Sequence, residues 1–459
     1  MKNPLLVPEI RELIENNDTA TLRELGTVAH PVDVADFISP LEPEEIWMVL
    51  RNIDQPLRSE IFSHLERELQ VDVVENLNRQ DIVNLFTDMT PDDRVDLFKN
   101  MPEDEREALL PAMAHSERED IRRLAAYEEG TAGSIMTPDY ATLSPEMTAT
   151  QAIDRLREVA PDKETIYCAY VLDQARNLLG FVSLKDLIVA RRDATIKSIM
   201  RKEPVFVSVD EDQEQAARQM QKYDMIAMPV LNEAGAMVGI ITHDDASDVL
   251  LQEQTEDIEK LMAIGGSHEA GVYLRLSAWG HFKNRAVWLI ILAILGLISG
   301  FVVQSFEGLL MQFAILAVFM PMLADTGGNT GSQSVTLVIR ALALNEITPR
   351  DIFRVLLKEA KVSVMLGITL GLLAFGRVML YHWTGNFPDG HSVYLMGLAI
   401  GLALGLQVVT STLIGVLLPL GAARLKLDPA VIASPTLTTV VDITGLIIYF
   451  WTVKLIMGL

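Results

Sequence analysis

The hydrophobic pattern divides the chain into a polar first part and an apolar second part. Five long apolar segments follow residue 285, at 286–306, 309–342, 353–381, 393–420 and 429–457. A helix that spans a bilayer needs about 20 apolar residues. Each segment is long enough, so we predict an all-α transmembrane domain of five helices over residues 271–459.

Residues 1–128 show short helical patterns and no strand pattern. Proline followed by acidic residues recurs at 41–45, 89–93 and 101–105, as is typical of the first turn of a helix. We predict an acidic all-α N domain. Asp92 and Asp96 lie four residues apart on one helix face, and this segment alone favours a solvated acidic face for them.

Residues 129–250 contain an internal repeat. The sequence LGFVSLKD at 179–186 matches VGIITHDD at 238–245, so Gly180 and Asp186 correspond to Gly239 and Asp245. The same order of strand, helix and apolar strands surrounds each copy, and a period of this size indicates a repeated structural unit. The repeat resembles a tandem pair of CBS domains, a regulatory α/β module. In many families such pairs bind adenine nucleotides through the motif aspartate, and a role in dimerisation alone is the equal alternative.

The charge balance supports this division. The chain has 62 acidic and 38 basic residues, a net charge of −24, and nearly all of the excess lies before residue 286. An acidic amphipathic segment follows the repeat, and we predict a connecting helix at 251–270. Cys168 is the single cysteine, which excludes an internal disulfide and cysteine-based metal sites. No secretory signal is recognised, so we expect cytoplasmic soluble domains.

Basic residues between the apolar segments predict the orientation in the membrane. Arg350, Arg354 and Lys358 lie around the start of the third segment, and Arg424 and Lys426 lie between the fourth and fifth segments. By the positive-inside rule we expect a multi-pass protein of the cell inner (plasma) membrane. Its N-terminus would be cytoplasmic and its C-terminus outside.

Asp442 is the only charged residue between Pro429 and Val453. A lone carboxylate at this depth is costly, so it is a functional-site hypothesis by default. The second apolar segment contains DTGGNTGSQS at 325–334, which we expect to loosen the helix and present oxygen atoms to a cavity. Close helix packing through small residues is the alternative.

The candidate ligands are oxygen atoms, without a cysteine or histidine motif at ligand spacing, which favours Mg²⁺, Ca²⁺ or Mn²⁺. Mg²⁺ keeps several waters and needs only one or two protein carboxylates. A two-fold dimer with paired Asp442 side chains would supply two. We therefore expect an ion pathway, no enzymatic activity and no nucleic-acid partner.

These features together resemble the MgtE family of magnesium channels almost from end to end. The resemblance rests on the order of domains, on GGNTGSQ at 327–333 and on TVVDITGL at 439–446. It implies a multidomain membrane protein that is a homodimeric Mg²⁺ channel for magnesium uptake, closed by cytoplasmic Mg²⁺. It assigns the pore ion to Asp442, and it assigns the regulatory ions to Glu60, Asp92, Asp96, Asp212, Glu214, Asp224, Asp245, Glu253, Glu256, Asp257 and Asp428.

The resemblance also allows ATP at the CBS pair, with Asp186 at the ribose. Cys168 and Met225 stand where ATP-binding members can offer aromatic rings, which argues against a nucleotide. Two other functions stay open. Asp442 could relay protons in a coupled divalent cation transporter. Asp325, in an Asp-Thr-Gly sequence, could form an intramembrane protease dyad with it.

Overall fold

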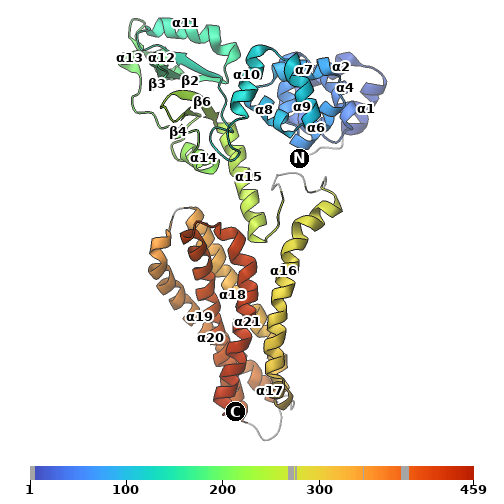
Figure 1. Ribbon diagram of the computed structural model, residues 1–459, viewed down its shortest axis with the longest axis vertical. Coiled ribbons are helices and arrows are strands. Elements are labelled where there is room, and N and C mark those ends of the chain that lie inside the picture. Colours follow the sequence, from blue (N-terminus) through green and yellow to red (C-terminus); the bar gives the residue numbers. More distant parts are fainter. Residues whose placement is uncertain (1–5, 267–272, 274–275, 345, 384–391, 459) are drawn as a thin grey trace. The chain divides into compact units, whose positions relative to one another are not determined.

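The computed structural model describes residues 6–266, 273, 276–344, 346–383 and 392–458, with the side chains of 56, 162 and 430–435 left out. The chain forms two compact units, Met1–Leu251 and Gln252–Leu459. Figure 1 shows their elements. The first unit contains helices followed by two small sheets, and the second is helical throughout its described residues.

The first unit begins with short helices around one hydrophobic core. Two proline-led starts predicted from the sequence are the first residues of helices, at Pro43 and Pro91, whereas Pro102 is the residue that precedes one. The all-α N domain is therefore confirmed. Its helices are α1 (Val7–Glu15), α2 (Thr19–Val28), α3 (Pro31–Ile38), α4 (Pro43–Leu50), α5 (Gln55–Ser63), α6 (Arg67–Glu75), α7 (Arg79–Asp88), α8 (Pro91–Asn100), α9 (Glu103–Leu109) and α10 (His115–Leu124).

The internal repeat forms two three-stranded sheets of the same topology, β1-β2-β3 and β4-β5-β6. In each sheet the first pair of strands is parallel and the second antiparallel. The α/β pair predicted from the repeat is therefore confirmed. Its elements are β1 (Tyr140–Leu143), α11 (Ala149–Val159), β2 (Thr165–Leu172), β3 (Leu178–Ser183), α12 (Leu184–Val189), α13 (Ile196–Ile199), β4 (Val207–Ser208), α14 (Gln213–Lys222), β5 (Ala227–Leu231) and β6 (Met237–Thr242).

The two copies of the repeat are interleaved at their motif glycines. A Cβ atom on Gly180 of the first copy would lie 2.4 Å from the carbonyl oxygen of Arg201, where the second copy begins. A Cβ atom on Gly239 of the second copy would lie 2.6 Å from the sulfur of Met136, where the first copy begins. Each entry segment therefore crosses the sheet of the other copy, and both crossings need glycine.

The acidic segment after the repeat is helical. Helix α15 spans His243–Leu261, so it begins within the repeated motif. Residues 267–270 of the predicted connecting helix lie outside the described residues.

Long helices form the second unit. By length and hydropathy, four described segments could span a membrane: Ala278–Ser305, Pro349–Trp383, Val393–Arg424 and Thr436–Met457. Helix α18 is not among them, because polar residues interrupt its apolar sequence, although its 29 residues are long enough. The helices are α16 (Ala278–Ser305), α17 (Glu307–Gln312), α18 (Ile315–Ala343), α19 (Ile352–Trp383), α20 (Val393–Arg424) and α21 (Pro429–Met457).

Candidate functional site

A buried polar cluster lies where α18 and α20 meet. Gln407 is 2% exposed, and its Nε2 donates a hydrogen bond of 3.0 Å to the carbonyl oxygen of Leu323. One turn later, the hydroxyl of Ser411 donates to the carbonyl oxygen of Gly327. These bonds join α20 to the α18 backbone inside the unit, where an unpaired polar group would be costly.

Glycine makes room for Gln407 on two sides. A Cβ atom on Gly327 of α18 would lie 2.3 Å from Nε2 of Gln407, and one on Gly445 of α21 would lie 2.2 Å from the same atom. Both distances are shorter than real Cβ contacts, so with the Gln407 amide in this position the two residues that face it must be glycine. Gly327 and Gly445, one from each motif, thus contact the same side chain, that of Gln407, which belongs to neither motif.

Helix α18 is continuous from Ile315 to Ala343. The expectation that 325–334 loosens this helix is therefore wrong. The small residues at Gly327, Gly331 and Ser334 are buried in one stripe along α18, as close helix packing requires. The structure supports the alternative, close helix packing through small residues.

Asp442 lies on α21 beside the buried stripe that contains Val441 and Gly445. It is partly exposed, and among the described residues no hydrogen-bond or ion-pair partner reaches its carboxylate. The carboxylate is therefore available to a group from outside the described residues.

Asp325 lies on the exposed side of α18 together with Asn329 and Gln333, away from the stripe at Gly327. No described contact joins it to Asp442. A protease dyad needs two carboxyl groups that share a proton. The geometry therefore gives the protease interpretation no support.

In the first unit, carboxylates of the N domain lie close to carboxylates of the repeat pair. Asp92 near the start of α8 is partly buried, and one of its oxygens has no hydrogen-bond partner in the described part of the chain. Burial raises the pKa of Asp92 well above its usual range, and the charges of Asp245 and Asp93 raise it further. Burial also raises the pKa of Asp245 to about 7, with support from Asp244 and Asp93. Helices α8 and α15 therefore bring two predicted ligands together.

Glu164 belongs to the same cluster and was not predicted. It lies directly before β2 and is exposed at the surface, but partial desolvation of its carboxylate together with the charges of Asp244 and Asp93 raises its pKa to about 7. Glu164, Asp93 and Asp244 were not among the metal ligands that the family resemblance assigned. Of these three residues, only Asp244 could have been suspected from the sequence, because it is adjacent to the motif residue Asp245.

Other predicted residues have partners or open surroundings. Asp96 pairs with Arg67, whose Nη2 lies 2.6 Å from Oδ2. Glu214 pairs with Arg218 on its own helix, and Asp212 accepts a bond of 3.0 Å from the backbone N–H of Gln215 as the residue preceding α14. Glu60, Asp212 and Asp224 are exposed. Among the described residues, no three carboxylate, imidazole or thiol groups form a metal cage.

The acids of the connecting helix lie near a lysine. Lys260 on α15 pairs with Glu256, and its Nζ lies 3.3 Å from Oδ2 of Asp428, directly before α21. Burial lowers the pKa of Lys260, but the bonds to Glu256 and Asp428 outweigh it, so the pKa is raised. Glu253 and Asp257 lie on the same helix and have further interactions. An ammonium group thus lies between two predicted Mg²⁺ ligands.

The predicted nucleotide residue is also paired. Oδ2 of Asp186 lies 3.3 Å from Nη2 of Arg201, and the backbone N–H of Asp186 donates to Ser183. Cys168 is largely buried, which raises its pKa to about 11. The thiol is therefore protonated and fits the apolar role expected for it.

Comparisons with known proteins cover nearly the whole chain. Residues 29–130 match the MgtE intracellular N domain, 132–193 and 196–252 match CBS domains, and 320–452 match the MgtE divalent cation transporter family. The chain is 39% identical over 455 residues to magnesium transporter MgtE of Thermus thermophilus, covering 98% of each. It is 33% identical to magnesium transporter MgtE of Bacillus subtilis, covering 72% of this chain and 70% of that protein.

Two crystal structures resemble the soluble part. One is the cytosolic domain of the Mg²⁺ channel MgtE in complex with ATP, with 35% identity and a TM-score of 0.50 over 52% of this chain and 98% of that one. The other is the soluble part of a magnesium transporter, with 29% identity and a TM-score of 0.51 over 54% and 97%. The chain therefore belongs to the MgtE family of magnesium transporters, which are multi-pass membrane proteins and not enzymes.

Proposed function

We propose that this protein is a Mg²⁺ channel for magnesium uptake, that two copies form the pore, and that Asp442 from each copy holds the passing ion. The observation that carries the proposal is the partly exposed carboxylate of Asp442 in the middle of α21, which no described residue pairs. A charge in this position needs a counter-ion or water. Hydrated Mg²⁺ supplies both.

A second polar surface supports a pore between two copies. Asp325, Asn329 and Gln333 are exposed on α18 in the single chain. Facing lipid, these side chains would each cost free energy. A homodimer that turns this side of α18 towards a water-filled path removes the cost. With five membrane crossings, cytoplasmic soluble domains would leave the C-terminus outside the cell.

We further propose that cytoplasmic Mg²⁺ closes the channel. The cluster of Asp92, Asp245 and Glu164 carries mutually repelling charges when fully ionised. Divalent cations reduce that repulsion, as protons do, and so favour the assembled arrangement of the first unit. Ligand binding shifts the gating equilibrium only by its differential affinity for the two states. The other predicted ligands, including Glu256, Asp257 and Asp428, would contribute near the membrane.

ATP at the CBS pair is a second proposal. It is supported by the relative whose cytosolic domain was solved with ATP. Asp186 would contact the ribose, and its partner Arg201 offers a positive charge to a phosphate. Isothermal titration of ATP to the intact protein, with Asp186→Asn as the variant, tests this. Equal binding by both would contradict the assignment of Asp186.

The main experiment measures Mg²⁺ flux into vesicles that contain the purified protein. We expect Asp442→Asn to abolish flux, because the neutral amide no longer attracts the cation, whereas Glu307→Gln, an exposed acid on α17, keeps it. Flux by Asp442→Asn at the original rate would contradict the pore assignment. Flux that requires a proton gradient would favour the coupled transporter.

Closure is tested separately by patch recording at high internal Mg²⁺. We expect the double variant Glu256→Gln, Asp257→Asn to stay open, since it lacks two of the acids that bind the closing ions. Normal closure in this variant would contradict the regulatory proposal and leave the role of Asp442 unaffected.

A further inference from the structure

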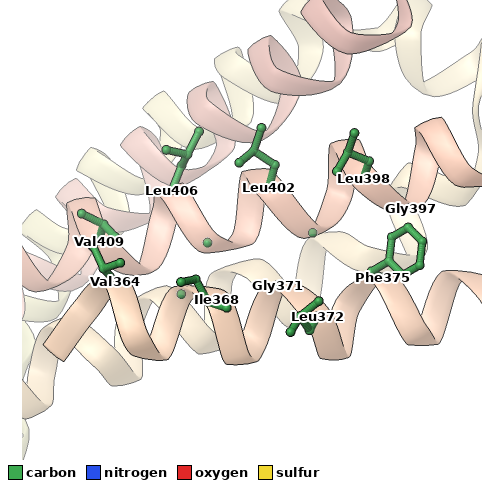
Figure 2. A pocket seen from close by; sticks show the side chains of 13 residues that line it. Val364, Ile368, Gly371, Leu372, Phe375, Gly397, Leu398, Leu402, Leu406 and Val409 are labelled. Atoms are coloured by element: carbon green, nitrogen blue, oxygen red, sulfur yellow. The ribbon is translucent and has the colours of Figure 1, made fainter. Parts of the chain in front are cut away.

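A groove of about 380 Å³ runs between α19 and α20. Figure 2 shows Leu398, Leu402 and Leu406 in a row along one helix, with Ile368 and Leu372 along the other. These five side chains are between 44% and 66% exposed. The lining is apolar apart from backbone atoms, which suits a hydrocarbon chain.

Close contact of the two helices creates the floor of the groove. A Cβ atom on Gly367 would lie 2.8 Å from the carbonyl oxygen of Gly405, and one on Gly371 would lie 2.7 Å from that of Gly401. The backbones touch at these glycines, and the larger side chains stand on either side. The result is a furrow along the helix pair.

The length of the groove matches one leaflet. From Val364 to Phe375, the ends of its α19 wall, an α-helix rises about 16 Å, close to half of the ~30 Å hydrocarbon core. A single acyl chain of one leaflet has this extent. A groove of this length would reach from one membrane surface to near the midplane.

Positive charge continues the groove towards that surface. Lys358 and Lys361 precede Val364 on α19, and helical periodicity places them on the same face as Ile368 and Leu372. Both lysines are exposed, and within the described residues no carboxylate lies at ion-pair distance from either. The neighbouring Glu359 points elsewhere, since it accepts a bond of 3.0 Å from Ser334 of α18.

A hydrocarbon furrow that ends at two ammonium groups is complementary to a lipid with a negatively charged headgroup. We propose that the groove between α19 and α20 binds an anionic phospholipid, with one acyl chain along Ile368 and Leu402 and the phosphate at Lys358 and Lys361. Basic pockets between transmembrane helices on the cytoplasmic side commonly bind such headgroups. The basic residues here lie on the side that the positive-inside rule assigns to the cytoplasm.

Native mass spectrometry of the full chain, titrated with phosphatidylglycerol or phosphatidylcholine, tests the headgroup. We expect phosphatidylglycerol to bind more tightly, and the double variant Lys358→Gln, Lys361→Gln to bind it about thirtyfold more weakly, since each basic residue contributes about 1 kcal/mol. The control Arg424→Gln, Lys426→Gln removes the same charge at and just after the last residue of α20, outside the groove lining, and should bind normally. Equal binding of both lipids, or equal loss in the control, would overturn the proposal.

The acyl chain is tested by filling the groove. Ile368→Trp should reduce binding about tenfold, whereas Leu373→Trp, on the same helix but outside the lining, should not. Inorganic phosphate should not displace the lipid, and complete displacement would reduce the site to an anion site. In a Cys168→Ala background, Leu402→Cys should not form a disulfide between copies in native membranes. Efficient cross-linking would show that a second copy covers the groove, which overturns the proposal.

Discussion

Nζ of Lys260 lies 3.3 Å from Oδ2 of Asp428, and the same ammonium group pairs with Glu256. This contact joins the end of α15 to the residue before α21. Asp442 lies 14 positions further along α21, about 21 Å at the rise of an α-helix. The ammonium group of Lys260 thus occupies a place where Mg²⁺ is proposed to act. Helix α21 connects this place to Asp442, the proposed pore residue.

If the ammonium competes with Mg²⁺ for these carboxylates, its removal should strengthen closure. We expect Lys260→Met to close at about fivefold lower internal Mg²⁺, because partly exposed ion pairs are each worth about 0.2–1 kcal/mol. Flux recorded against internal Mg²⁺ measures this. Lys260→Arg keeps the charge and should behave like the unaltered protein. A Lys260→Met channel that needs more Mg²⁺ to close would instead show that the ion pair itself stabilises the closed state.

Much of the fold could be predicted from the sequence because it is encoded locally. Proline followed by acids marks helix starts such as Pro91, and the repeated motif around Gly180 and Gly239 predicts two equivalent sheets. Asp442 could be singled out from hydropathy alone. The continuity of α18 could not be predicted, since glycine and polar residues lower helix propensity. Packing against Gln407 and Ser411 compensates for the lowered propensity.

The acidic cluster of the first unit could not be predicted from the sequence for a different reason. Glu164 has no helical or strand pattern of its own, and its neighbours Asp93 and Asp244 are far away in the sequence. The fold alone brings Asp93 and Asp244 close enough to raise the pKa of Glu164. A family resemblance identifies motif residues such as Asp92 and Asp245, but charges acquired through tertiary contacts need the structure.

These raised pKa values predict how pH affects the first unit. Glu164 and Asp245 have pKa values of about 7 when folded, against about 4 in an unfolded chain. Between these values the folded state binds more protons, so its stability should fall as pH rises from about 4 to 7 and level off above. Mg²⁺ should therefore slow hydrogen exchange in α8 and β2 more at pH 8 than at pH 6, as measured by mass spectrometry of the full chain.

The double variant Glu164→Gln, Asp245→Asn should lose most of this pH dependence, because neither side chain titrates. Glu158→Gln removes an acid that pairs with Arg155 at the surface and should retain it. Protection that rises with pH in the unaltered protein, or an unchanged profile in the double variant, would contradict the assignment of the pKa values to these residues.

Gly445 offers a test of the three-helix contact around Gln407. In Gly445→Ala the new methyl group would lie 2.2 Å from Nε2 of Gln407, so the amide must move and release the carbonyl oxygen of Leu323. We expect a loss of about 1–3 kcal/mol, as for a buried polar group left without its partner, seen as a lower unfolding temperature in detergent. Gly421→Ala meets no atom within 4 Å and should be neutral. Combining Gly445→Ala with Gln407→Ala should cost less than the sum of the two, since the smaller side chain leaves room for the methyl group. Strict additivity would mean that Gly445 and Gln407 do not share this space.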